Sequence, residues 1–77
     1  MPTGNQLKAA RALAGLEQRQ VAVKAKINVT TLFRMEDCGD RPVRGLAHNV
    51  EAVIDVLRKE GVEITSDGVR LTHRTKR

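Results

Sequence analysis

The chain has 77 residues, with 14 Lys and Arg against nine Asp and Glu, two His and one Cys. This length fits one domain that is too small to enclose a large active-site cavity. Cys38 has no partner for an internal disulfide, and Cys38, His48 and His73 are too few and too scattered for a structural zinc site. No apolar run is long enough to span a bilayer or to act as a signal peptide. We therefore expect a soluble, cytoplasmic protein that uses no metal or cofactor.

Charge is distributed unevenly along the chain. Residues 1–44 carry eight Lys and Arg against four Asp and Glu, residues 45–69 carry two against five, and residues 70–77 carry four bases and no acid. A net charge of +5 and a pI near 10.2 favour a polyanionic partner, and nucleic acid is the commonest one for a small cytosolic domain. Composition alone leaves open the alternative that the charge serves solubility.

The first helix is predicted to begin at a capping box formed by Thr3 and Gln6. Its apolar positions follow helical spacing, and the helix should end at Gly15, which suits a left-handed C-cap. The apolar positions are Leu7, Ala10, Leu13 and Ala14.

Two short helices are predicted within residues 17–36. Val21, Ala22 and Ala25 fall on one face of the first, and Leu32 and Met35 on one face of the second. Asn28 is a strong N-cap type, so a new helix should begin there after a turn of three or four residues. Two helices joined in this way form a helix-turn-helix, which presents the N-terminal turn of its second helix to the major groove of DNA.

Basic and amide side chains flank this helix pair. Gln18 and Arg19 lie in the first turn of the first helix, where side chains can donate to a phosphate. Arg41 and Arg44 lie on either side of Pro42 in the turn-rich segment that follows the second helix, within reach of a DNA backbone. Ordinary solvated surface charge is the alternative for each of them.

A fourth, amphipathic helix and a β-hairpin are predicted in the rest of the chain. The helix has apolar positions Val50, Val53, Ile54 and Leu57 and should end at Gly61. Asn49 is interpreted as an N-cap that separates it from a short helical turn at 45–48. Residues 62–64 and 69–71 alternate apolar and charged around an Asp-Gly turn signal, which indicates a hairpin. The basic tail, 73–77, is expected to be disordered until it meets a phosphate.

With these elements in place, the chain resembles the lambda-repressor-like helix-turn-helix family, the Cro and xenobiotic-response-element type of bacterial and phage regulator. The resemblance is carried by Leu7 to Arg11, Gly15 to Gln18, Val21-Ala22, Ala25 to Glu36, the Arg-Pro loop, the fourth helix, and Gly61 to Ile64 with Gly68 to Leu71. The last two segments are similar to a subgroup of very short regulators with a small C-terminal β-element. The resemblance implies a mainly α domain of four to five helices at 1–61, a hairpin at 62–72 and the tail at 73–77.

The resemblance also implies which residues contact DNA. Val29 and Thr30 fall where family members touch base edges, Phe33 and Arg34 follow on the same exposed face, and Gln18 braces the second helix against the backbone. Thr31 ranks lower, because its hydroxyl more often faces the helix or the core. The full predicted set is Gln18, Arg19, Asn28, Val29, Thr30, Thr31, Phe33, Arg34, Arg41 and Arg44. Family members also pair an arginine of the first helix with the glutamate that ends the third, here Arg11 and Glu36.

Two positions depart from the family pattern. Lys26 stands where a glycine is usual in the turn, so either a left-handed lysine costs about 1 kcal/mol or the turn differs in shape. Glu17 replaces the usual Ser or Thr cap, which is expected to weaken the start of that helix by ~1 kcal/mol.

The predicted function is a sequence-specific regulator that binds double-stranded DNA as a homodimer on an inverted repeat. A lone hairpin is marginal in water, so its apolar residues, Val62, Ile64, Val69 and Leu71, are predicted to form the dimer interface. The rival is a hairpin that folds back onto the fourth helix of a monomer. A protein-interaction module of the antitoxin or antiactivator type is the alternative function. An enzyme is not expected, because no paired-carboxylate, Cys/His or Ser/His arrangement is present. RNA binding is not favoured either, because the chain has one aromatic residue, Phe33, and so lacks the stacking platform that readers of single strands usually need.

Overall fold

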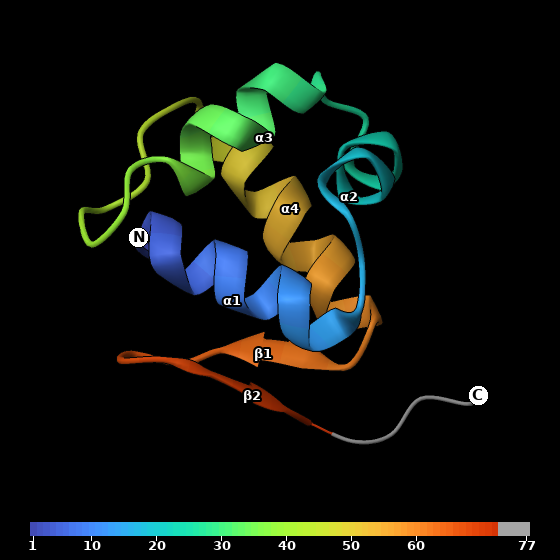
Figure 1. Cartoon of the computed structure of the whole chain (residues 1–77), viewed down its shortest axis with the longest axis vertical. Coiled ribbons are helices and arrows are strands. Elements are labelled where there is room, and N and C mark those ends of the chain that lie inside the picture. Colours follow the sequence, from blue (N-terminus) through green and yellow to red (C-terminus); the bar gives the residue numbers. More distant parts are fainter. Residues whose placement is uncertain (73–77) are drawn as a thin grey trace.

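The computed structural model describes residues 1–72, which form four helices and one two-stranded antiparallel sheet (Figure 1). The elements are α1 (Gly4–Ala14), α2 (Gln18–Ala25), α3 (Val29–Glu36), α4 (Ala47–Lys59), β1 (Val62–Ile64) and β2 (Val69–Leu71). Helix α1 lies between α3 on one side and the hairpin on the other, and α4 packs behind it (Figure 1). None of the helices in this part of the chain is long and apolar enough to cross a membrane. The predicted basic tail, 73–77, lies outside the described residues.

The ends of α1 follow the predicted local signals. The Thr3 hydroxyl accepts a hydrogen bond from the backbone N–H of Gln6 at 3.1 Å, and Gln6 Oε1 accepts one from the Thr3 N–H at 2.9 Å. Gly15 adopts the left-handed conformation with φ of 76°. The capping box and the C-cap are therefore confirmed, and both depend only on residues close in sequence.

The predicted break at Asn49 is wrong, because α4 runs without interruption from Ala47. Leu46 is the N-cap, and the backbone N–H of Asn49 donates to its carbonyl oxygen at 3.0 Å. Asn49 is thus already inside the first helical turn, where its own N–H takes part in the helix. Residues 1–72 consequently contain four helices, and no separate helical turn precedes α4.

Gly4 allows α1 to approach the end of α3 closely. A Cβ atom at this position would lie 2.6 Å from the carbonyl oxygen of Glu36 and 2.7 Å from that of Met35. The next residue, Asn5, donates its backbone N–H to the Gly39 carbonyl at 2.8 Å. The loop after α3 therefore satisfies a free N–H at the start of α1, and only glycine fits at the contact.

The hairpin belongs to the same hydrophobic core as the helices. The largest fully buried side chains come from all four helices and from β1: Leu7, Val21, Leu32, Met35, Val50, Val53, Leu57 and Val62. Strand β1 packs against α1 and α4, and β2 against α1. The hairpin is therefore folded onto helices of its own chain, including the fourth helix as the rival arrangement expects, whereas the monomer of that rival stays a prediction.

This packing corrects one residue of the predicted dimer interface, Val62. Val62 is only 1% exposed, because its own α1 and α4 cover it, so it has no surface to offer a second copy. Ile64 and Val69 are half-buried and pack against the same core. Leu71, the last of the predicted four, remains 49% exposed.

One side chain of α1 fixes the hairpin loop. Gln6 Nε2 donates to the carbonyl oxygens of Thr65 at 2.8 Å and of Gly68 at 3.1 Å. The predicted turn lies where expected, but none of its residues has a left-handed φ. It is therefore not the Asp-Gly turn with positive φ at both central residues. The amide of Gln6, which lies 59 residues before Thr65 and 62 before Gly68, holds the loop instead.

Candidate nucleic-acid interface

A turn of three residues joins α2 to α3. Lys26 has φ of 60° and ψ of 44°, so the first of the two predicted alternatives, a left-handed lysine, is the one that occurs. Asn28 then caps α3, with its Oδ1 accepting from the backbone N–H of Thr30 at 2.7 Å. This confirms the predicted start of α3 and commits the Asn28 oxygen to the cap.

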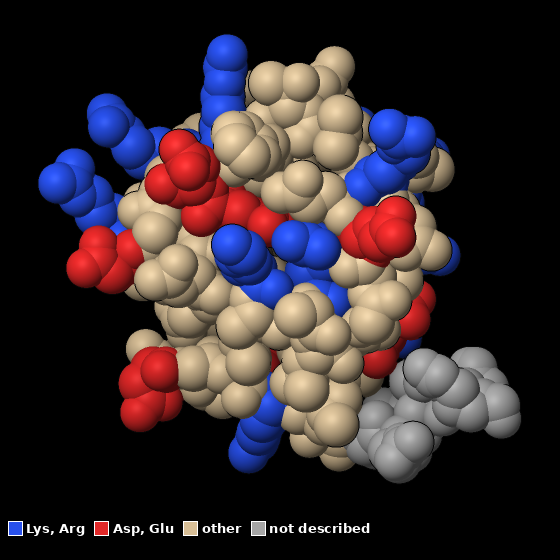
Figure 2. All heavy atoms as spheres, in the orientation of Figure 1, with Lys and Arg blue, Asp and Glu red and all other residues tan. Residues whose placement is uncertain are grey.

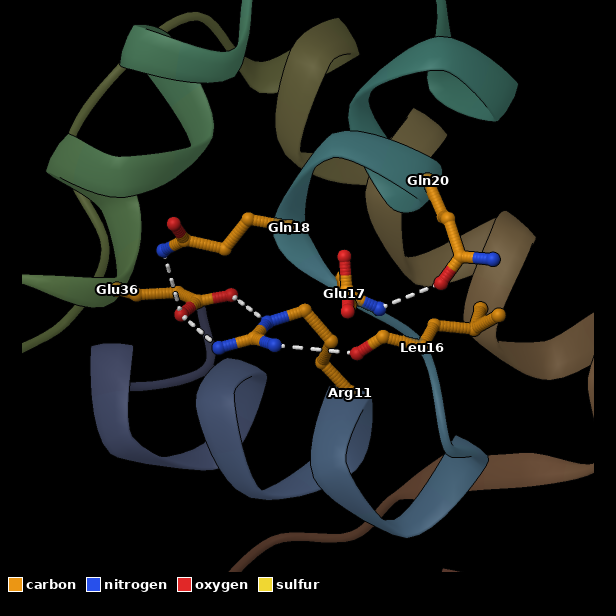
Figure 3. A network of polar contacts seen from close by, with 6 residues as sticks. All are labelled: Arg11, Leu16, Glu17, Gln18, Gln20 and Glu36. Carbon is orange, nitrogen blue, oxygen red and sulfur yellow. Dashed lines mark hydrogen bonds and ion pairs between the residues drawn. The ribbon is translucent and has the colours of Figure 1, made fainter.

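The inner face of α3 ends in a carboxylate held by two other helices (Figure 3). Arg11 of α1 donates from Nε to Glu36 Oε2 at 2.7 Å and from Nη2 to Glu36 Oε1 at 3.0 Å. The Glu36 side chain is 4% exposed and the Arg11 side chain 17%. The hydrogen-bonded carboxylate holds the pKa of Arg11 above its ordinary value, against the opposing effect of burial. The expected pairing of these two residues is confirmed.

Gln18 of α2 completes this network. Its Nε2 donates to Glu36 Oε1 at 3.1 Å, and the third Arg11 contact runs from Nη1 to the Leu16 carbonyl oxygen at 3.1 Å (Figure 3). One N–H of the Gln18 amide thus donates to a buried carboxylate, and because the same nitrogen carries a second N–H, the contact of Gln18 with a phosphate stays a prediction. The network joins α1, α2 and α3 and fixes the orientation of α3.

A hydrogen bond from the backbone of Glu17 to the side chain of Gln20 supports the start of α2, although Glu17 is not a usual cap residue. The side chain of Gln20 accepts the backbone N–H of Glu17 at 2.8 Å, so a glutamine again reaches back to the residue three positions earlier (Figure 3). Helix α1 begins with the pattern Thr-x-x-Gln at residues 3–6, and α2 begins with the similar pattern Glu-x-x-Gln at residues 17–20.

The outer face of α3 is open to solvent. Val29 is 39% and Phe33 54% exposed, although both are apolar. Thr30 and Arg34 are exposed beside them, and neither side chain makes a hydrogen bond or ion pair with residues 1–72. Thr31 is half-buried, which agrees with its lower rank among the predicted DNA contacts. The structure thus brings Val29, Thr30, Phe33 and Arg34 together on one accessible helix face.

A hollow of about 420 Å³ at the C-terminal end of α3 gathers three arginines. Its lining is Arg34, Asp37, Cys38, Arg41 and Arg44. Within the described chain none of the three guanidinium groups forms an ion pair. Figure 2 shows Lys and Arg side chains projecting at the upper left, where Figure 1 places the end of α3 and the loop after it.

The loop that carries Arg41 and Arg44 is anchored to the N-terminus of the chain. The Arg41 carbonyl oxygen accepts from the Gly4 N–H at 3.2 Å, and the Val43 N–H donates to the Pro2 carbonyl at 2.8 Å. Val43 itself is buried. The backbone under both arginines is therefore held in place, while their side chains remain exposed.

Lys8 also lies on this surface, although no sequence pattern indicated it. It lines a second hollow of about 280 Å³ together with Arg11, Gln18, Phe33, Glu36 and Asp37. Lys8 is one helical turn before Arg11 on α1, so the Arg11 to Glu36 pairing brings it next to the open face of α3. Arg19, predicted to contact phosphate, is exposed in the first turn of α2.

No cluster of three or more His, Cys, Asp or Glu side chains that could hold a metal ion occurs in residues 1–72. Comparison of the chain with family models, with curated proteins and with solved structures finds no match.

Proposed function

We propose that the chain is a transcriptional regulator that binds double-stranded DNA in a sequence-specific manner, with α2 and α3 acting as a lambda-repressor-like helix-turn-helix. One observation carries the proposal: α3 exposes an accessible face whose polar side chains, Thr30 and Arg34, have no partner in residues 1–72. A helix offered in this way fits the major groove, which is wide enough to admit one.

The side chains on this face have the chemistry to read base edges. Thr30 offers a hydroxyl and a methyl group, and Arg34 can donate to guanine or to a phosphate. Val29 and Phe33 would pack on thymine methyl groups, which accounts for two apolar side chains left open to water. Their exposure leaves the domain intact, because the core is complete without them.

The surrounding cations supply the sequence-independent part of binding. Arg41 and Arg44 project from the anchored loop and Arg19 from the start of α2, so they flank the reading face and would contact phosphates on both sides of it. Gln18 acts indirectly in this proposal, by orienting α3 through Glu36.

The experiment compares binding to a duplex from the protein's own promoter region with binding to a random duplex, over a series of salt concentrations. We expect preference for the promoter duplex and weakening of both complexes as salt rises. Equal, weak binding to both duplexes would overturn the proposal. It would favour the protein-interaction alternative, for which the exposed Val29 and Phe33 would be the docking residues.

A further inference from the structure

The open face of α3 carries its apolar and polar side chains on two separate strips. Val29 and Phe33 are four residues apart, and so are Thr30 and Arg34, so each pair lies along one side of the helix. Adjacent residues are about 100° apart around the helix axis, so the two strips run side by side. We call Val29 and Phe33 the apolar strip. The helix thus offers a partner two apolar groups next to two polar ones.

Positive charge adjoins the apolar strip. Arg34, which follows Phe33, lines the hollow at the C-terminal end of α3. The same hollow contains Arg41, Arg44 and one acid, Asp37, and within residues 1–72 none of its guanidinium groups forms an ion pair. Positive charge beside exposed apolar groups complements a polyanion better than it complements a second apolar protein surface. The strip therefore fits apolar groups that are carried on a polyanion.

The base edges in the major groove of DNA offer an apolar group of this kind. Thymine carries a methyl group at C5, whereas the other groups on the base edges are hydrogen-bond donors and acceptors. An apolar side chain placed against such a donor or acceptor leaves it without a partner, which costs free energy. A cytosine methylated at C5 carries its methyl group at the same position of the pyrimidine ring. Both bases can therefore cover an apolar side chain, whereas uracil and unmethylated cytosine cannot.

We propose that the apolar strip recognises C5-methyl groups on thymine and on 5-methylcytosine alike, so that cytosine methylation at the recognised positions strengthens binding. The proposal rests on the proposed function and names the feature of DNA that the strip recognises. Val29 and Phe33 are about 6 Å apart along the helix. Successive base pairs are about 3.4 Å apart, so a helix that lies along the groove meets two methyl groups about two base pairs apart.

The size of the expected effect follows from the area that each methyl group buries. Burying one methyl-sized group in an apolar contact changes affinity about fourfold. Two such contacts give a difference of about fifteenfold between a duplex that contains thymine and the same duplex with uracil. Phosphate contacts do not involve C5, so a random duplex should show no such difference.

The test measures the affinity of the full chain for its own promoter duplex and for the same duplex with deoxyuridine in place of every thymidine. We expect the uracil duplex to bind about fifteenfold more weakly. Single exchanges of thymidine for deoxyuridine then locate the recognised methyl groups. At each located position the T·A pair is replaced by C·G and by 5-methylcytosine·G, two duplexes that differ by one methyl group. The methylated duplex should bind about fourfold more tightly, and equal binding would overturn recognition of 5-methylcytosine.

Variants assign the methyl effect to the apolar strip. Phe33→Ala and Val29→Ala should each lower the thymine-to-uracil affinity ratio from about fifteenfold to about fourfold, and Phe33→Leu should retain most of it. The matched control is Leu13→Ala, which removes an apolar side chain about as exposed as Val29, at 42% against 39%. Leu13 is two residues after Arg11, on the side of α1 turned away from α3, so its removal should leave the ratio unchanged. Each ratio compares two duplexes for one variant, so a change in stability cancels.

The outcomes separate the methyl proposal from the proposed function. Preference for the promoter duplex over random duplex, with equal affinity for thymine and uracil, would overturn the methyl proposal alone. No preference for the promoter duplex would overturn the proposed function and the methyl proposal with it. A thymine-to-uracil ratio that stays at about fifteenfold in Phe33→Ala and Val29→Ala would show that uracil acts through DNA shape. That result would overturn the assignment to the apolar strip.

Discussion

The two faces of α3 differ in how their polar groups are satisfied. On the inner face, Glu36 accepts three hydrogen bonds from Arg11 and Gln18 while almost fully buried. On the outer face, the side chains of Thr30 and Arg34 have no partner among the described residues and are exposed to solvent. Buried polar groups must be paired within the fold, whereas solvated ones can exchange water for a ligand. The inner face should therefore determine stability and the outer face binding.

The largest effect is expected from Arg11→Ala. This change leaves the Glu36 carboxylate desolvated without its cation, so the free energy of unfolding should fall by about 3 to 5 kcal/mol. Chemical denaturation measures the loss, and a cycle with Glu36→Ala measures the coupling between the two side chains. A coupling energy near zero would contradict the role assigned to this pair.

The matched control is Arg58→Ala, which also removes an arginine from an ion pair with a carboxylate. Arg58 and Asp55 are 63% and 47% exposed and 3.4 Å apart, so water already solvates both groups. We expect a loss of less than about 1 kcal/mol. A similar loss for both variants would show that burial does not distinguish the two pairs.

Thr30→Ala and Arg34→Ala should have the opposite profile. If these side chains touch bases, each substitution should weaken binding to the specific duplex by about 1 to 3 kcal/mol and change binding to random duplex little. Because neither side chain has a partner in residues 1–72, the free energy of unfolding should change by less than about 0.5 kcal/mol.

Lys59→Ala is the control for the loss of one positive charge. Lys59 lies on α4, paired with Asp55 at 3.1 Å, away from the open face of α3. Its removal should weaken binding to both duplexes equally and slightly. If Arg34→Ala behaves in the same way, Arg34 is a phosphate contact and does not read bases.

Local signals made most element boundaries predictable. Thr3, Gly15 and Asn28 each act on backbone groups within a few residues, and the structure places all three caps as predicted. Asn49 shows the limit of this reasoning, because the same residue type can cap a helix or lie in its first turn. Which outcome occurs depends on where the preceding backbone turns, and Leu46 starts α4 before Asn49 can cap it.

Contacts between distant residues were much less predictable. The Arg11 to Glu36 pair came from the family resemblance, whereas nothing in the sequence indicated that Gln18 would share the same carboxylate. The same holds for Gln6, whose capping role is local but whose two bonds to the hairpin loop require α1 and the loop to pack together. For the candidate interface, the sequence identified the exposed face of α3 but not the neighbouring Lys8.

Gln6 and Gln20 provide a second, smaller version of the comparison. Both side chains reach back to the residue three positions earlier, but only Gln6 also donates to two half-buried carbonyl groups, those of Thr65 and Gly68. Glutamate at position 6 would keep the capping oxygen and lose the donor. We expect Gln6→Glu to cost about 1 to 3 kcal/mol of stability at neutral pH, since two carbonyl oxygens would then face a carboxylate.

Gln20→Glu is the control. This substitution should change the free energy of unfolding little, because the Gln20 side chain only accepts a hydrogen bond, from the Glu17 N–H, and a carboxylate can accept it too. The difference between the two variants should also depend on pH. Carbonyl oxygens around position 6 would raise the pKa of the introduced carboxyl in the folded state. The cost is then fully present above that pKa and shrinks as the pH falls through it, because the protonated carboxyl can donate again. Thermal unfolding of both variants across the acidic range measures this, and parallel curves would contradict it.

The smallest effect concerns Lys26, whose left-handed backbone lies in the turn between α2 and α3. Its left-handed conformation costs about 1 kcal/mol for a residue with a Cβ, whereas glycine adopts it freely. Part of that gain is lost to the greater freedom of glycine in the unfolded chain, so Lys26→Gly should stabilise the domain by about 0.5 kcal/mol. Lys24→Gly removes the same charge from within α2 and should instead destabilise by about 1 kcal/mol. Denaturant titration of the two variants gives opposite signs if the left-handed strain is real. Destabilisation by both would mean that the Lys26 side chain contributes more to the turn than its backbone strain costs.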